Sequence, residues 1–225
     1  MAKDIVIVGG GSAGWMTAAY LSKALDRMDS IRVVESPRVK SIGVGEATFS
    51  TVKLFFDFLE LDERDWMPPT NASYKMGIRF VGWRRDGGHF YHPFQRYEVV
   101  DGYNLGEWWL RLQDGRRGGE EAAHPEPFDY ACFTVPALCD HLRSPRHLDG
   151  RVFDERVQGF YSEADGPANK VMVEHRVQYP YAYHFDAALL ADFLRGYAVQ
   201  RGVEHIADEV LDVHLGADGS IDHLV

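Results

Sequence analysis

The sequence predicts an α/β fold that opens with a strand, a helix and a second strand. The apolar run Asp4–Val8 ends in glycines, residues from Ser12 to Met28 carry apolar side chains at helical spacing, and the β-branched run Ile31–Glu35 follows. Short apolar or β-branched runs bounded by turn residues are typical of strands. Because strands joined through a helical crossover run parallel, the first 35 residues should form one βαβ unit.

Two further elements and a loop are predicted in the middle of the chain. Apolar residues from Phe49 to Leu61 fall on one helical face and predict a second helix. Lys75–Trp83 alternates in polarity and predicts a continuous strand with Lys75 at its N-terminal end. The stretch Asp114–Pro127 is rich in glycine, proline and charge without periodicity, so we expect a surface loop there.

The last part of the chain returns to regular structure. Asp186 can cap a helix that continues to the region of Arg201, because its carboxylate can accept hydrogen bonds from the first backbone N–H groups. Val203–Val225 then predicts two strands joined by a turn at residues 217–220.

The composition is that of an acidic globular protein. Its 225 residues allow one domain or slightly more, with 45% hydrophobic and 13% aromatic residues to form a core. No run approaches the roughly 18 apolar residues of a membrane helix, so we expect no membrane association. The formal charge of -10 would repel a phosphate backbone, so we expect a small ligand and no nucleic acid.

Cysteine usage indicates a reducing, cytoplasmic setting. Cys132 and Cys139 are the only cysteines, and no apolar leader precedes the first strand. We expect both cysteines to be small buried apolar residues. His89 and His92 are spaced as if to share a metal ion, but no carboxylate or further histidine clusters with them, so no metal is predicted.

The strongest motif is a glycine turn between the first strand and the first helix. Gly9-Gly10-Gly11-Ser12-Ala13-Gly14 fits G-x-G-x-x-G, whose glycines allow a tight turn, a close approach to a pyrophosphate and close packing of helix on strand. The phosphate would lie at the helix N-terminus. Glu35 ends the second strand, where a carboxylate accepts hydrogen bonds from ribose hydroxyls. These residues predict a Rossmann-type dinucleotide site, and a glycine-rich packing turn is the alternative.

That motif does not decide between FAD and NAD. Ser41–Thr48 (SIGVGEAT) follows soon after Glu35, and its glycines would let the backbone pass close to a large flat ring such as an isoalloxazine. An ordinary loop between a strand and a helix explains the segment equally well.

Seven segments, in order along the chain, resemble the flavin-dependent tryptophan halogenases. They are GGGSAGWMTAAYL from Gly9, GVGEAT from Gly43, NASYK from Asn71, HFYHPF from His89, PFDYAC from Pro127, SPRHLDG from Ser144 and YHFDAALLADFLR from Tyr183. The resemblance extends over essentially all 225 residues. GWM, GVGEAT and the lysine of NASYK are its most specific elements, since a general flavin monooxygenase would be expected to share only the glycine motif.

The resemblance implies a fold and a domain organisation. The fold would be a Rossmann-type FAD-binding unit of the flavin monooxygenase kind, with an inserted, partly β substrate-side region. Residues 1–225 would be the N-terminal portion of one halogenase module, with the FAD-binding βαβ unit at 1–50, the substrate-side region at 71–185 and a return to the FAD-binding domain at 186–225. Family members are much longer, and their W-x-W-x-I-P signature, catalytic glutamate and C-terminal substrate contacts have no counterpart in this sequence.

The resemblance also implies a chemistry. In the family, reduced FAD and dioxygen oxidise chloride or bromide to hypohalous acid, which acts on the aromatic substrate with the help of a lysine. Lys75 aligns with that lysine and would be a hydrogen-bond donor to the hypohalous acid or a haloamine. From spacing alone, Lys75 is only a polar residue on the exposed face of a strand.

The remaining site residues are assigned by the same resemblance. Cofactor binding would use Gly9, Gly11, Ser12, Ala13, Gly14, Glu35, Gly45, Glu46, Ala47 and Val210, with Val210 at the adenine. His92 and Phe94 would line the pocket of the aromatic substrate, whose ring would stack on Phe94. Glu46 and Thr48 would belong to a strap between the flavin and substrate sites.

The resulting hypothesis is FADH2-dependent halogenation of tryptophan or a related indole. A separate flavin reductase would supply the reduced cofactor, because the chain carries no second nucleotide motif for NAD(P)H. A homodimer is left open. Three alternatives remain: halogenation of a phenol or pyrrole, a flavin-dependent hydroxylase, and a truncated flavin-binding module without catalysis.

Overall fold

The computed structural model describes residues 4–25, 30–39, 45–96, 98–117, 126–145 and 181–225. The chain forms two compact units. Unit 1 consists of Met1–Glu46, Phe55–Ser73 and His184–Val225, and unit 2 of Ala47–Leu54 and Tyr74–Tyr183. Residues 41–44 of the second glycine-rich segment and residues 146–150 of the SPRHLDG segment lie outside the described residues.

The sheet of unit 1 is parallel, as the βαβ pattern predicts. β1 (Asp4–Val8) pairs in parallel with β2 (Ser30–Val34), and β10 (Glu204–Ile206) pairs in parallel with the other side of β2. Val33 of the central strand is fully buried, which is the environment that its β-branched sequence favours. The carboxyl ends of all three strands therefore meet at one edge of the sheet.

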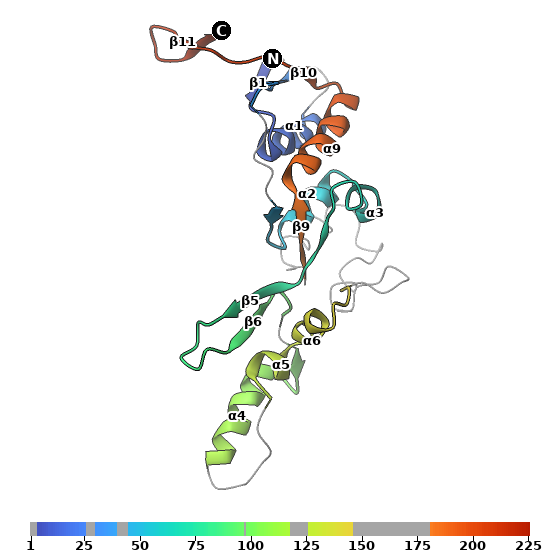
Figure 1. The fold of residues 1–225 in the computed structure, drawn as a ribbon, viewed down its shortest axis with the longest axis vertical. Coiled ribbons are helices and arrows are strands. Elements are labelled where there is room, and N and C mark those ends of the chain that lie inside the picture. Colours follow the sequence, from blue (N-terminus) through green and yellow to red (C-terminus); the bar gives the residue numbers. More distant parts are fainter. Residues whose placement is uncertain (1–3, 26–29, 40–44, 97, 118–125, 146–180) are drawn as a thin grey trace. The chain divides into compact units, whose positions relative to one another are not determined.

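Two helices of unit 1 lie side by side (Figure 1): α1 (Ser12–Ala24) and α9 (Ala187–Gln200). The buried residues of this pair are Trp15, Ala18, Ala19, Ala187, Leu190, Ala191, Leu194 and Ala198. The many alanines allow the two backbones to approach closely. Asp186 caps α9 as predicted, because its Oδ1 accepts hydrogen bonds from the backbone N–H groups of Ala188 and Leu189 at 2.9 and 3.1 Å.

The second predicted helix is shorter than its apolar pattern. α2 spans Val52–Phe58 rather than Phe49–Leu61. It ends early because Glu60 adopts a left-handed backbone conformation with φ 60°, which an α-helix cannot contain. The short α3 (Glu63–Trp66) follows, and Trp66 stacks on Phe56 with 3.8 Å between ring centroids.

The end of the chain contains three strands where the sequence predicts two. β10 joins the parallel sheet, and only β11 (Val213–Leu215) and β12 (Ile221–Leu224) form the predicted antiparallel hairpin. The hairpin turn uses Gly219 at φ 82°, a conformation that glycine adopts without strain. The prediction of two strands was wrong because the apolar pattern does not show that residues 207–212 leave the sheet.

Unit 2 is a mixture of short strands and helices. β5 (Gly77–Val81) and β6 (His89–Pro93) form an antiparallel ribbon, and β7 (Val99–Val100) and β8 (Tyr103–Asn104) form a second one. The helices are α4 (Leu105–Arg117), α5 (Phe128–Cys132) and α6 (Val135–Asp140). A further sheet, whose strands contain residues assigned to both units, has the order β3-β9-β4, from β3 (Gly45–Ala47), β9 (Ala182–Asp186) and β4 (Ser73–Lys75).

Two predictions for this region are corrected. The strand expected to run without a break from Lys75 to Trp83 is divided at Met76, whose carbonyl accepts a hydrogen bond from Phe94 N at 2.9 Å. The loop expected from Asp114 begins later, because α4 continues to Arg117. Residues 118–125 of that loop lie outside the described residues.

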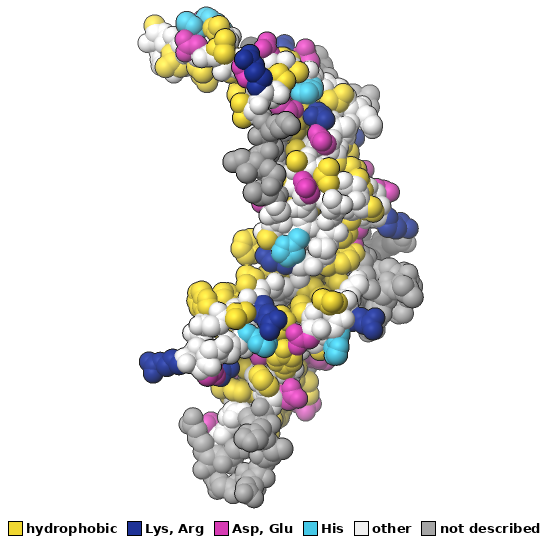
Figure 2. Space-filling model, viewed as in Figure 1, with side chains coloured by type: hydrophobic (Ala, Val, Ile, Leu, Met, Phe, Trp, Pro, Cys, Tyr) yellow, Lys and Arg dark blue, Asp and Glu magenta, His cyan; other side chains and the backbone are white. Residues whose placement is uncertain are grey.

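None of the helices in the described part of the chain is long and apolar enough to cross a membrane. On the face that Figure 2 shows, lysine and arginine side chains of the described residues are scattered among acidic and apolar ones.

Candidate functional site

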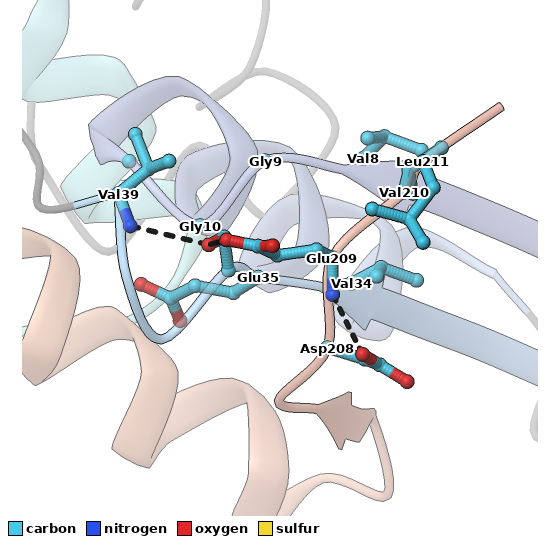
Figure 3. A pocket seen from close by; sticks show the side chains of 12 residues that line it. Val8, Gly9, Gly10, Val34, Glu35, Val39, Asp208, Glu209, Val210 and Leu211 are labelled. Carbon is cyan, nitrogen blue, oxygen red and sulfur yellow. Dashed lines mark hydrogen bonds between the residues drawn. The ribbon is translucent and has the colours of Figure 1, made fainter. Parts of the chain in front are cut away.

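A cavity of about 410 Å³ opens in unit 1 beside the glycine turn (Figure 3). Its walls come from the ends of β1 and β2, from the residues that follow them, and from the segment after β10. The lining residues are Val8, Gly9, Gly10, Gly11, Val34, Glu35, Ser36, Val39, Asp208, Glu209, Val210 and Leu211. The cavity therefore lies at the carboxyl edge of a parallel sheet, where α/β folds bind their ligands.

The glycine turn has the geometry that its sequence motif requires. Gly9 has φ 111°, which side chains rarely tolerate, and its N–H donates to Val34 O at 2.9 Å. A Cβ on Gly14 would lie 1.9 Å from Gly9 O, so only glycine lets α1 approach the turn this closely. The first helical hydrogen bond runs from Trp15 N to Gly11 O at 3.0 Å. The N–H groups of residues 12–14 thus precede the helical ladder and favour an anion.

Glu35 lies beside Gly10 and lines the same cavity. Its Oε2 is 3.0 Å from His205 Nε2, accepts a hydrogen bond from Trp15 Nε1 at 3.3 Å, and is 3.7 Å from Arg195 Nη1. The sequence singled out Glu35 but gave no role to His205 or Arg195, which are distant from Glu35 along the chain.

The opposite wall of the cavity, at Glu209, is joined by a hydrogen bond and an ion pair to the loop after β2. The Ser36 hydroxyl donates to Glu209 Oε1 at 2.8 Å, and Arg38 Nη2 is 3.1 Å from Glu209 Oε2. Asp208 Oδ1 accepts from Glu209 N at 2.8 Å (Figure 3). Val210 follows Glu209 in the chain and lines the same cavity as Gly9 and Glu35.

Other candidate cofactor residues do not line this cavity. Ser12, Ala13 and Gly14 belong to the first turn of α1, where Ser12 Oγ donates to Ala187 O at 3.3 Å. Gly45, Glu46 and Ala47 form β3 and are exposed. The Thr48 N–H that follows β3 donates to Tyr183 O at 3.0 Å, and Tyr183 N donates to Thr48 Oγ1 at 3.1 Å.

Lys75 lies in a small site built within unit 2. Its Nζ donates to Thr48 O at 3.0 Å and is 5.4 Å from the centroids of both the Phe49 and the Phe94 rings. Aromatic faces at this distance attract a cation. The half-buried ammonium is thus held by a carbonyl oxygen and two rings. The sequence identified Lys75 and Phe94 but gave Phe49 no role beyond an apolar helix pattern.

The two predicted substrate residues have different environments. Phe94 is 5% exposed and contacts the Lys75 ammonium, whereas His92 on β6 is exposed and pairs across the ribbon with Ile78. A Cβ on Gly77 would lie 2.7 Å from His92 O, so glycine lets β5 pass close to this strand. The structure brings Phe94, but not the imidazole of His92, into contact with Lys75.

A polar cluster that the sequence did not predict fixes β6 to α5 and α6. Tyr91 N donates to Asp129 Oδ2 at 2.7 Å, while the hydroxyls of Tyr91 and Tyr130 both donate to the Asp140 carboxylate. The hydrogen bond to Asp140 raises the pKa of Tyr130 to about 12. Burial, and then the hydrogen bond to Asp140, raises the pKa of Tyr91 above its usual range. The same bonds, first from Tyr130, lower the pKa of Asp140.

The cysteines and the histidines take no part in a metal cluster among the described residues. Cys132 is buried and Cys139 is partly buried, and burial raises the pKa of both thiols. The expectation of a buried cysteine is thus met by Cys132 and only partly by Cys139.

The parallel sheet, the glycine turn and the cavity at the carboxyl edge define a dinucleotide-binding α/β protein of the Rossmann type. The family model for tryptophan halogenase matches residues 4–225, and the chain belongs to this family. The resemblance seen in the sequence is therefore confirmed.

Relatives of known activity support the same assignment. The chain is 55% identical over 223 residues to the 7-chloro-L-tryptophan 6-halogenase KtzR of Kutzneria sp. (strain 744), covering 98% of this chain and 41% of that protein. It is 40% identical over 233 residues to the tryptophan 7-halogenase RebH of Lentzea aerocolonigenes, covering 97% of this chain and 38% of that protein.

Solved structures have the same fold. The crystal structure of the tryptophan 6-halogenase SttH from Streptomyces toxytricini matches with a TM-score of 0.81 at 47% identity, over 100% of this chain and 41% of the SttH chain. The chain thus spans about two-fifths of the length of these relatives. The fold prediction of an FAD-type α/β protein agrees with these neighbours.

Proposed function

We propose that the protein containing this chain catalyses FADH2-dependent halogenation of tryptophan or a related indole. Its co-substrates would be chloride or bromide and dioxygen. The observation that supports this proposal is that Lys75, which by resemblance aligns with the lysine of the family, directs its ammonium to two phenyl rings and a backbone carbonyl. The chain would be the N-terminal portion of one halogenase module.

The cavity of unit 1 fits the adenosine diphosphate half of FAD. The glycine turn offers backbone N–H groups and room for a diphosphate, and a carboxylate and Val210 line the same space. Gly9, Gly11, Ser12, Ala13 and Gly14 would hold the diphosphate, Glu35 the ribose, and Val210 the adenine. Gly45, Glu46 and Ala47 would lie at the isoalloxazine. When bound in its reduced form, FAD supplies the electrons with which dioxygen oxidises the halide to hypohalous acid.

Lys75 would deliver the halogen. As a charged donor it would bind the oxygen of HOCl while an indole carbon takes the chlorine, so that HOCl and Ar–H give Ar–Cl and water. As a haloamine, the neutral amine and HOCl would give N–Cl and water, and N–Cl would then exchange its chlorine for the ring hydrogen. The contacts of Lys75 favour the charged donor, because a carbonyl oxygen and ring faces are partners for an ammonium ion.

Phe94 would give the substrate its position. An indole ring packed against this buried phenyl ring would bring its carbons near Lys75 Nζ, which lies 5.4 Å from the Phe94 centroid. His92 would contribute from the exposed side of the same strand. A separate flavin reductase would supply FADH2 in the cytoplasm.

Product analysis tests this function. The intact protein is given FAD, a flavin reductase, NADH, air and sodium chloride, with tryptophan, a phenol or a pyrrole as substrate. Mass spectrometry should find chlorotryptophan that disappears when chloride is omitted. Chlorinated phenol or pyrrole with untouched tryptophan would overturn the substrate assignment, and an oxygenated product formed equally well without chloride would show a hydroxylase.

A further inference from the structure

We propose that Trp15, Arg195 and His205 are positioning residues that hold Glu35 by one carboxylate oxygen and thereby set the affinity for the adenosine half of FAD. This inference rests on the proposed FAD site and concerns residues that the glycine motif does not include. It has two parts: three donors that fix Oε2 of Glu35, and a glycine that leaves room for Oε1.

The three donors come from three separate elements of unit 1. Trp15 is a fully buried residue of α1, Arg195 belongs to α9, and His205 belongs to β10. Their nitrogens lie 3.3, 3.7 and 3.0 Å from the same atom, Glu35 Oε2. The edge-to-face contact of the Trp15 and His205 rings, with centroids 5.3 Å apart, fixes two of the donors against each other. Glu35 is thus held from two adjacent helices, α1 and α9, and from strand β10.

Gly10 provides the space for the rest of the carboxylate. A Cβ on Gly10 would lie 2.0 Å from Glu35 Cδ and 2.4 Å from Oε1. Gly10 stands at a variable position of G-x-G-x-x-G, so the motif itself does not require glycine there. The requirement comes from Glu35, whose carboxylate occupies the place of a side chain at residue 10.

This arrangement suits the binding of a ribose next to a diphosphate. Oε2 is occupied by protein donors, whereas Oε1 lies next to Gly10, and both Glu35 and Gly10 line the cavity. Oε1 would therefore be the oxygen that accepts from ribose hydroxyls. A carboxylate that is already oriented loses less side-chain entropy on binding. Arg195 also offsets the negative charge that Glu35 brings close to an anionic ligand, although Asp192 shares this guanidinium at 2.8 Å.

Binding measurements on the intact protein test the proposal. FAD and ADP are titrated by isothermal calorimetry, since ADP carries the ribose and diphosphate without the flavin. His205→Leu and Gly10→Ala should each weaken both ligands by about tenfold, the loss of about one hydrogen bond to a charged group. His205→Gln keeps an N–H donor and should restore most of the affinity. His223→Leu, on the exposed hairpin, is the matched control and should leave binding unchanged.

A double-mutant cycle separates positioning from a general structural effect. In a Glu35→Ala background, His205→Leu and Gly10→Ala should cause no further loss, because their effect passes through Glu35. Two results would overturn the proposal. One is that His205→Leu or Gly10→Ala lowers the affinity in the Glu35→Ala background as much as in the wild type. The other is that His205→Leu binds both ligands like the wild type. Circular dichroism shows whether each variant is folded. Should Gly10→Ala fail to fold, the comparison of His205→Leu with His205→Gln decides alone.

The wild-type titration distinguishes this proposal from the proposed function. A wild-type protein that binds neither FAD nor ADP would remove the cofactor site itself. A wild-type protein that binds both ligands, with variants that bind equally well, would leave the cofactor site in place and remove only the positioning role.

Discussion

The cavity of unit 1 and the lysine site of unit 2 are built from different parts of the chain. Gly9 and Gly14 shape the turn beside the cavity through the backbone, so their spacing along the sequence is fixed by steric limits. The site around Lys75 is built from one carbonyl and the side chains Phe49 and Phe94, which have no fixed spacing. A site made by the backbone can therefore be identified from sequence alone, whereas a site made by side chains needs the fold or a relative.

Substitution of Gly14 should have the largest effect on the backbone-built site. In Gly14→Ala the new methyl group would lie 1.9 Å from Gly9 O, and a backbone atom cannot move away without disturbing the turn. We expect a loss of about 3 kcal/mol in the free energy of unfolding, together with loss of FAD binding. Denaturant unfolding and FAD titration measure both.

Gly196→Ala is the matched control for that substitution. Gly196 lies inside α9 with no atom within 4 Å of an added Cβ, so alanine should stabilise the protein by up to about 1 kcal/mol. Equal effects of the two substitutions would contradict the steric account of the turn.

Removal of one ring should have a moderate effect on the side-chain-built site. Phe49 is 67% exposed, so Phe49→Leu removes an aromatic face from Lys75 with little loss of core packing. We expect chlorination to fall by about twofold to fivefold, the equivalent of about 0.5–1 kcal/mol for an exposed cation–π contact. Phe58→Leu is the control, because Phe58 lies 5.6 Å from Lys23 Nζ in a similar contact in unit 1. A Phe49→Leu enzyme as active as Phe58→Leu would show that the ring does not hold Lys75.

The smallest effect concerns the cluster that supports β6. The Tyr130 pKa of about 12 is raised by its bond to Asp140, so the stability from this bond is full below about pH 10 and is lost as the pH rises toward 12. The lowered pKa of Asp140 gives stability that is present above about pH 4 and is lost as the pH falls through that lowered value.

Asp140→Asn should therefore lower the free energy of unfolding at neutral pH. It should also weaken the pH dependence of that free energy in both the acidic and the alkaline range. Ultraviolet titration of tyrosine ionisation should show Tyr130 ionising at lower pH in the variant. An unchanged titration curve would mean that Asp140 does not control Tyr130.

Elements with a local cause were predicted well from the sequence. The βαβ unit and the cap of α9 at Asp186 follow from short-range sterics and hydrogen bonding, and the structure has both. The break at Met76 and the departure of β10 from the hairpin were missed, because they depend on which distant strand each segment pairs with.

The candidate site shows the same division. The glycine turn and Glu35 could be named from spacing, but His205 meets Glu35 only after the chain has folded. Lys75 was named through resemblance to a family, since nothing in an alternating strand distinguishes it from other lysines. No role at the Lys75 site was predicted for Phe49, because its apolar side chain fitted the predicted helix. In the structure that helix begins only at Val52.

The most direct measurement is the yield of chlorotryptophan per FADH2 oxidised by the intact enzyme, compared between Lys75→Ala and Lys23→Ala. Lys23 lies over the Phe58 ring and pairs with Glu60 at 3.0 Å, so it is also a lysine in contact with an aromatic ring, but it lies outside the Lys75 site. We expect Lys75→Ala to consume reduced flavin while forming no chlorotryptophan, and Lys23→Ala to form it at the wild-type yield. Chlorotryptophan at the wild-type yield from Lys75→Ala would contradict the role of Lys75.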